Sequence, residues 1–212
     1  MPRFKSSLFK ALGTCAILGL VSATQVSAAN PQLLMKTSLG DITLELNAEK
    51  APISTLNFIN YASSKYYDGT IFHRVMSTFM IQGGGFDTNI DKKNAGLRPP
   101  IKNEWKNGLK NVKGSIAMAR LGRQPDSATA QFFINVVDNG GLDQPRDGAG
   151  YAVFGKVAKG QDIVEKIRTT PTEENPKYPG GKVVPATTVV IESVRLIGDY
   201  DASQLETKVK KV

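Results

Sequence analysis

Residues 72–86 read FHRVMSTFMIQGGGF, and this stretch decides how the rest of the chain is interpreted. It combines one guanidinium (Arg74), one side-chain amide (Gln82) and several bulky apolar side chains, with a glycine triplet at 83–85. The triplet is not a phosphate-binding loop, because no GK[ST] follows it. It suits a bulge or a close approach of two backbones. The chemistry that such a segment supports depends on hydrogen bonds and apolar contacts, and we expect no metal and no cofactor.

Hydrophobic patterns on either side of this segment predict short strands. Residues 41–46 alternate apolar and polar side chains, as a half-buried strand does. Residues 33–37 precede them across a short turn, so the two segments form a predicted hairpin. Further apolar strands are predicted at residues 70–74, 80–83, 115–119, 131–136, 152–156 and 188–196.

Two short helices complete the predicted pattern. Pro52 suits the first turn of a helix, and apolar residues then recur at spacings of three and four up to Ala62. A second helix is predicted at about residues 160–168, followed by a loop at 171–185. Many short strands with two short helices indicate a mostly-β sandwich or closed barrel, and periodicity alone does not choose between them.

The N-terminal segment is typical of a cleaved secretory signal. Three basic residues precede an uncharged, mostly apolar run at 11–21, and small residues then lead to Ala28. The run falls short of the roughly 20 residues that a membrane-spanning helix needs. We therefore expect residues 1–28 to be removed before Ala29, and the mature protein to be exported to the periplasm with no membrane attachment.

Cys15 is the single cysteine, and it lies inside the predicted signal. A lipoprotein interpretation is poor, because Thr14 is an unsuitable residue before a lipidated cysteine and the apolar run continues past Cys15. The mature chain then has no cysteine and no disulfide, so its stability must come from a core.

The charge of the chain is basic but scattered. Loss of the three basic residues of the signal lowers the formal net charge from +8 to +5. Lysines cluster only at the extreme end, residues 208–211, and no basic stripe alternates with aromatics, so an ordinary solvated surface fits better than a nucleic-acid partner. Residues 198–212 are mostly polar, and we expect a loosely ordered tail.

Five blocks of this sequence resemble blocks of the cyclophilins and occur in the order that they have in that family. The likeness extends over residues 33–197. It is greatest to the exported cyclophilins of Gram-negative bacteria, which also have a longer loop, here at residues 144–150. The resemblance implies one isomerase domain at residues 29–197. Its expected fold is a closed eight-stranded antiparallel barrel, capped at each end by a helix, with the active site in a groove on the outer face. The blocks are residues 72–86, GSIAMAR (114–120), QFFINV (131–136), GLD (141–143) and YAVFGKV (151–157).

The reaction implied by the resemblance is rotation about the peptide bond before proline. Its barrier, near ~20 kcal/mol, exists because the proline nitrogen shares its lone pair with the carbonyl group. The lone pair becomes localised in the twisted transition state, so a donor placed there binds that state best. A guanidinium is permanently charged and offers several donors in a rigid fork. By resemblance Arg74 is this donor, whereas an isolated arginine would be interpreted as a surface residue.

The resemblance also implies a pocket for the proline ring, formed by Phe79, Met80, Phe133 and Leu142. Read without the family, Phe79, Met80 and Phe133 would be core residues. However, adjacent residues of a strand point to opposite faces, so either Phe132 or Phe133 must face outward.

Other positions match the family's groove. Gln82 matches the residue that hydrogen-bonds the substrate backbone and orients the arginine, while Ala119 and Gln131 match residues that contact the residue before proline. Arg120 stands where many cyclophilins have asparagine, and the contact there is made largely by backbone. His73, the single histidine, is interpreted as a packed residue, because the reaction transfers no proton.

Two positions depart from many eukaryotic relatives. Gly141 replaces a tryptophan beside the pocket, and Tyr151 replaces a groove histidine. Both positions are tied in the family to cyclosporin binding, so we expect weak cyclosporin binding with activity retained. The expected partners are proline-containing, unfolded or partly folded exported chains, bound by a monomer. The alternative is a chaperone that binds such segments in the same groove without catalysis. Arg74 distinguishes the two functions, because a chaperone that only binds could lose the guanidinium at little cost.

Overall fold

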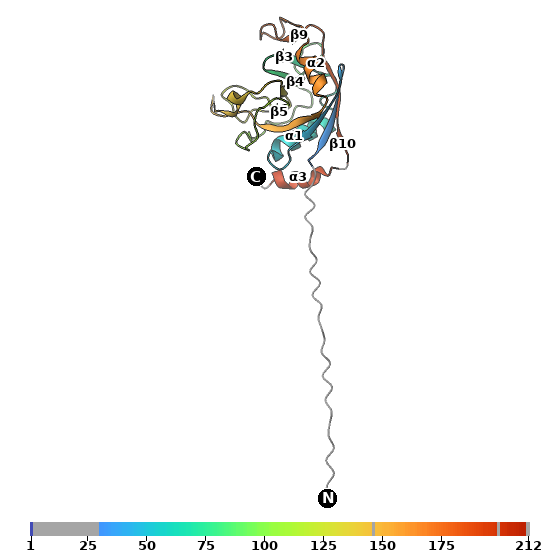
Figure 1. Ribbon diagram of the computed structural model, residues 1–212, viewed down its shortest axis with the longest axis vertical. Helices are drawn as coiled ribbons and strands as arrows, with labels where there is room; N and C mark the ends of the chain where they lie inside the picture. The colour runs from blue at the N-terminus through green and yellow to red at the C-terminus, as the bar shows by residue number, and fades with distance from the viewer. Residues whose placement is uncertain (2–29, 146, 199, 211–212) are drawn as a thin grey trace.

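The computed structural model describes residue 1 and residues 30–145, 147–198 and 200–210 (Figure 1). The predicted signal and its cleavage site lie outside the described residues, apart from Met1. Among the described helices, none has both the length and the apolar character needed to cross a bilayer.

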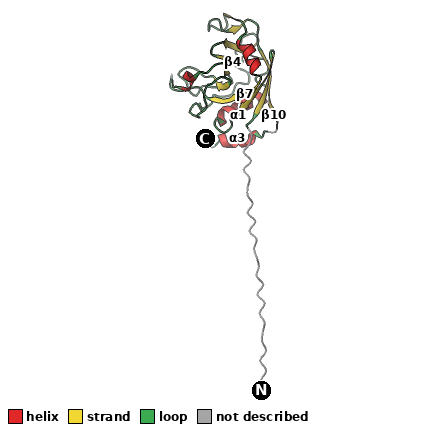
Figure 2. Ribbon diagram, in the orientation of Figure 1, coloured by secondary structure: helices red, strands yellow, loops and turns green. Residues whose placement is uncertain are grey.

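Eight strands form a closed antiparallel barrel, and their order around it is β1-β10-β3-β4-β6-β5-β7-β2. This decides between the barrel and the sandwich, and it confirms the fold expected from the resemblance. Figures 1 and 2 show the strands and helices of this domain. A separate short pair, β8 (Thr172–Glu173) and β9 (Val184–Pro185), lies within the predicted loop. The barrel strands are β1 (Gln32–Thr37), β2 (Gly40–Leu46), β3 (Thr70–Met76), β4 (Met80–Asp87), β5 (Ser115–Met118), β6 (Phe132–Asn135), β7 (Val153–Lys159) and β10 (Val190–Ile197).

Apolar side chains fill the barrel interior. Phe132 lies in this core, where its ring meets that of Phe58 edge to face at 5.5 Å and that of Phe72 at 6.0 Å. Phe154 and Tyr67 extend the same aromatic cluster around Phe58. Edge-to-face contacts of this kind stabilise the core beyond the area that they bury.

A helix closes each end of the barrel (Figure 1). α1 (Pro52–Ser63) begins with proline in its first turn, as predicted, and buries Phe58, Ile59 and Ala62. The first backbone N–H groups of the helix have no partner within it, and a residue distant in sequence supplies one. Glu104 accepts hydrogen bonds from the N–H groups of Ile53 and Ser54. A carboxylate at this position also complements the helix dipole. α2 (Gln161–Arg168) covers the opposite end.

The C-terminal residues correct one expectation. Instead of a loosely ordered tail, the chain forms α3 (Ala202–Val209), which packs against α1. Asp201 caps the helix by accepting a hydrogen bond from the N–H of Ser203 at 2.9 Å. Leu205 is only 3% exposed and supplies the apolar contact that the polar composition of the segment concealed.

Candidate active site

Cross-strand pairing brings three of the predicted site residues to one face of the barrel. Arg74 on β3 pairs with Gln82 on β4, and Gln82 pairs with Phe133 on β6. Directly paired residues of antiparallel strands point to the same side of the sheet. Since Phe132 points into the core, Phe133 and its partners face outward, which answers the question left open by the sequence.

The glycine triplet makes this arrangement possible. The register between β3 and β4 shifts on both sides of Phe72, so the triplet lies opposite an irregular stretch of its partner strand. Gly84 has φ +81°, a backbone conformation that residues with a side chain rarely adopt. A Cβ on Gly85 would lie 2.4 Å from the side chain of Gln131, so only glycine lets that side chain lie across the strand.

A chain of side-chain hydrogen bonds orients the guanidinium. Nη1 of Arg74 donates to Oε1 of Gln82 at 3.2 Å and lies 3.9 Å from Sδ of Met80. Gln82 in turn donates from Nε2 to Oε1 of Gln131 at 2.9 Å. Within the described residues the other guanidinium nitrogens of Arg74 make no hydrogen bond, so they are free to donate to a ligand on this face.

An apolar cluster, the candidate pocket for a proline ring, lies beside the guanidinium. Met80, Phe133 and Leu142 belong to a buried cluster on the outer face, separate from the barrel core. Leu142 comes from a single 3-10 turn, η1 (Gly140–Asp143). Phe79, Ala119 and Tyr151 are partly buried and pack against this cluster. The structure thus brings together all four residues predicted to hold a proline ring.

Behind the pocket lies a buried amide network that the sequence interpretation missed. The side chain of Asn135 donates to Oδ1 of Asn111 at 3.1 Å and to Oγ of Ser115 at 2.9 Å, and it accepts from Nδ2 of Asn139 at 2.7 Å. Asn139 also donates to the carbonyl of Phe79 at 2.7 Å, which ties the network to a pocket wall. Asn135 lies two residues after Phe133, on the same face of the strand. This spacing is the signal in the sequence that could have placed a polar group beside the pocket.

The remaining groove residues lie along a cavity of about 480 Å³ on the same side of the barrel. Gln82, Ala119 and Gln131 line it, as expected. Arg120 lines it too, but its side chain is only 1% exposed and pairs with Asp147. The charged end of Arg120 is therefore held within the protein by Asp147.

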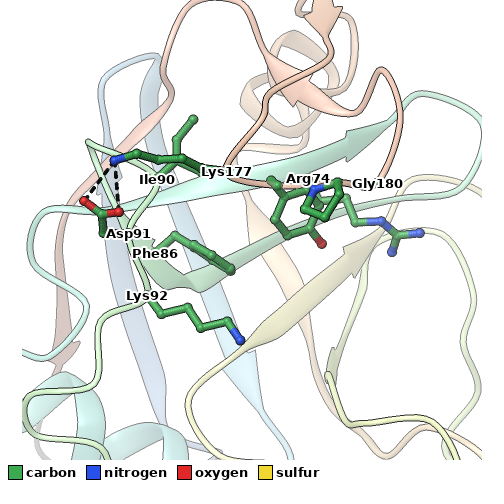
Figure 3. Close-up of a pocket in the computed structure, with 9 residues that line it drawn as sticks. Arg74, Phe86, Ile90, Asp91, Lys92, Lys177 and Gly180 are labelled. Atoms are coloured by element: carbon green, nitrogen blue, oxygen red, sulfur yellow. Dashed lines mark hydrogen bonds and ion pairs between the residues drawn. The ribbon is translucent and has the colours of Figure 1, made fainter.

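A second cavity, of about 650 Å³, adjoins Arg74 (Figure 3). Lys177 and Asp91 line one side of it and form an ion pair, with Nζ 2.9 Å from Oδ1. The Arg74 guanidinium extends away from this pair in Figure 3. Arg74 thus contributes to this cavity without being neutralised by Asp91.

His73 is packed, as interpreted from the sequence. Its side chain is fully buried, and its ring lies 4.4 Å from that of Phe86 and 5.3 Å from that of Tyr178. Burial lowers the pKa of His73 to about 3. The imidazole is therefore neutral at physiological pH.

The chain is similar in sequence to a known family and to several named proteins. A family model described as cyclophilin type peptidyl-prolyl cis-trans isomerase/CLD matches residues 32–196. A peptidyl-prolyl cis-trans isomerase of Acinetobacter baylyi is 51% identical over 180 residues, covering 85% of this chain and 93% of the relative. Peptidyl-prolyl cis-trans isomerase A of Dickeya dadantii is 46% identical over 187 residues, covering 86% and 95%.

A solved structure shares the fold. A cyclophilin type peptidyl-prolyl cis-trans isomerase of Cryptosporidium parvum, crystallised in the presence of the dipeptide Ala-Pro, superimposes with a TM-score of 0.65. It is 24% identical and covers 79% of this chain and 99% of its own. At this identity the likeness concerns the fold alone.

Proposed function

The chain belongs to the cyclophilin-type peptidyl-prolyl cis-trans isomerases, and from that premise we propose that Arg74 accelerates the rotation by donating a hydrogen bond to the proline nitrogen. The pocket of Phe79, Met80, Phe133 and Leu142 holds the proline ring. One observation carries the proposal: the Arg74 guanidinium lies 3.9 Å from Met80, a wall of this pocket, with donors left free.

The proposed donor acts selectively on the transition state. In both planar isomers the proline nitrogen is conjugated and accepts poorly, whereas in the twisted state its lone pair is available. Gln82 holds the guanidinium in place before the substrate arrives, so little reorganisation is needed during rotation. A preorganised donor of this kind contributes about 100-fold or more to a rate, equivalent to ~2.7 kcal/mol of barrier.

The proposed substrates are proline-containing segments of unfolded or partly folded exported chains. Support for the proline requirement comes from the apolar cluster beside Arg74 and from the peptidyl-prolyl cis-trans isomerases of Acinetobacter baylyi and Dickeya dadantii, to which the chain is 51% and 46% identical. Support for export comes from the signal pattern of residues 1–28. Expression of the full chain in a Gram-negative host, followed by fractionation and N-terminal sequencing, tests this part. We expect a periplasmic protein that begins at Ala29, and an intact N-terminus in the cytoplasm would contradict it.

A protease-coupled assay with proline peptides tests the role of Arg74. We expect Arg74→Ala to lower kcat/KM about 100-fold. The matched control is Arg98→Ala, because Arg98 is exposed and contributes only backbone groups to hydrogen bonds in the described structure. A loss below about threefold in Arg74→Ala would favour a binding chaperone that needs no donor.

A further inference from the structure

The Arg120 side chain ties a long loop to the barrel. It follows the end of β5, and its guanidinium donates to Oδ2 of Asp147 at 3.1 Å and to the carbonyl of Gly150 at 3.2 Å. It also donates to the carbonyl of Ala149. The same Asp147 carboxylate accepts from the backbone N–H of Arg123 at 2.9 Å, so two loops meet at this ion pair.

The guanidinium also contacts the pocket wall. Its central carbon lies 4.4 Å from the centre of the Tyr151 ring, which is cation–π distance. Tyr151 then meets Phe133 edge to face at 5.7 Å, and its backbone N–H donates to the carbonyl of Leu142 at 2.9 Å. Arg120 is therefore linked through Tyr151 to Phe133 and Leu142, two members of the proline pocket.

We propose that Arg120 is a positioning residue for the isomerase reaction: its side chain fixes Tyr151 as the outer wall of the proline pocket without itself touching the substrate. Arginine suits this role better than lysine. Its planar fork donates to the loop carbonyls and Asp147 at once, while its face covers the tyrosine ring. This inference rests on the proposed use of the outer pocket for proline.

The ion pair is built to persist. The side chain of Arg120 is 1% exposed, so solvent does not compete for its donors. Hydrogen bonding from Arg120 lowers the pKa of Asp147 to about 2, so the carboxylate keeps its charge over the physiological range. The charged carboxylate therefore continues to hold the Arg120 guanidinium beside the Tyr151 ring over that range.

Steady-state kinetics on proline peptides separate positioning from chemistry. We expect Arg120→Gln and Asp147→Asn each to raise KM about three- to tenfold with kcat changed less than twofold, because a wall contact serves ground and transition states alike. Arg120→Lys should not restore KM, since it keeps the charge but loses the planar fork. The matched control is Asp68→Asn, which breaks the other bidentate pair, Arg195 with Asp68, and should leave KM unchanged.

Tryptophan fluorescence supplies an independent readout. Trp105 is the only tryptophan of the chain, and its ring packs on Gly150, where an added Cβ would lie 2.9 Å away. Release of the loop in Arg120→Gln and Asp147→Asn should shift the Trp105 emission to longer wavelength, while Asp68→Asn should not. An unshifted spectrum together with unchanged KM in both variants would overturn the inference.

A double-mutant cycle shows whether Arg120 acts through Tyr151. Once Tyr151→Leu has removed the wall, the additional change Arg120→Gln should cost less than twofold in KM. Equal costs in the two backgrounds would overturn the inference. Its failure is distinct from failure of the proposed function, because the latter would show as full activity in Arg74→Ala whatever happens at Arg120.

Discussion

Replacement of Asn135 by alanine should destabilise the barrel and loosen the pocket together. The Asn135 side chain is fully buried and makes three hydrogen bonds, to Asn111, Ser115 and Asn139. Each such bond contributes about 1 kcal/mol, and partners left buried without a bond add to the loss. We therefore expect the free energy of unfolding to fall by about 3 kcal/mol, and Tm by roughly 6–12 °C for a domain of this size.

The assay is urea unfolding of the mature chain, with isomerase kinetics measured on the folded variant. KM should rise, because Asn139 loses the partner that helps it hold the Phe79 carbonyl. Thr55→Val is the matched control, since Thr55 is buried and its hydroxyl has no hydrogen-bond partner in the described structure. We expect this control to be neutral or slightly stabilising. A loss below about 1 kcal/mol for Asn135→Ala, or an equal loss for Thr55→Val, would show that the amide network does not stabilise the barrel.

Three further outcomes are expected. Glu104→Ala removes the acceptor at the start of α1 and should lower the unfolding free energy by about 2 kcal/mol in urea titrations, with kcat/KM per folded molecule unchanged; loss of activity without loss of stability would contradict this. Because burial lowers the pKa of His73 from 6.5 to about 3, the unfolded chain takes up the proton first. The free energy of unfolding should therefore fall by about 1.4 kcal/mol for each pH unit below roughly pH 6, and the fall should be less steep in His73→Leu. The pH profile of kcat/KM should show no inflection near pH 6.5, and such an inflection would indicate that the histidine is catalytic. With Gly141 and Tyr151 in place of the family's tryptophan and histidine, cyclosporin should inhibit weakly, and inhibition at nanomolar concentration would overturn this expectation.

Local patterns in the sequence predicted most of the fold. The hairpin at residues 33–46 and the helix beginning at Pro52 follow from alternation and from proline at the first turn, and both are present. Closure of the barrel could not be read from periodicity, because it depends on pairing between strands distant in sequence, such as β1 with β10. α3 was missed because the few apolar residues that anchor it, Leu205 with Tyr200 and Ala202, stand in a segment that is otherwise mostly polar.

The site was predicted through its motif, and the structure shows why the motif has that form. Gly85 must lack a side chain so that Gln131 can reach Gln82, a requirement between strands that spacing along the chain does not reveal. The pairing of the Arg120 side chain was equally impossible to predict from the sequence. Its partner Asp147 lies 27 positions away in a loop, and nothing in either local sequence indicates that they meet.

The most direct test of the account compares binding with rotation on the same molecule. NMR exchange measurements on a proline peptide saturated with enzyme give the affinity and the rate of cis–trans interconversion in the bound state. For Arg74→Ala we predict an affinity within about threefold of the wild type and an interconversion rate about 100-fold slower, because the donor meets the proline nitrogen only during rotation. An unchanged interconversion rate with weakened binding would contradict the account and leave Arg74 as a binding residue.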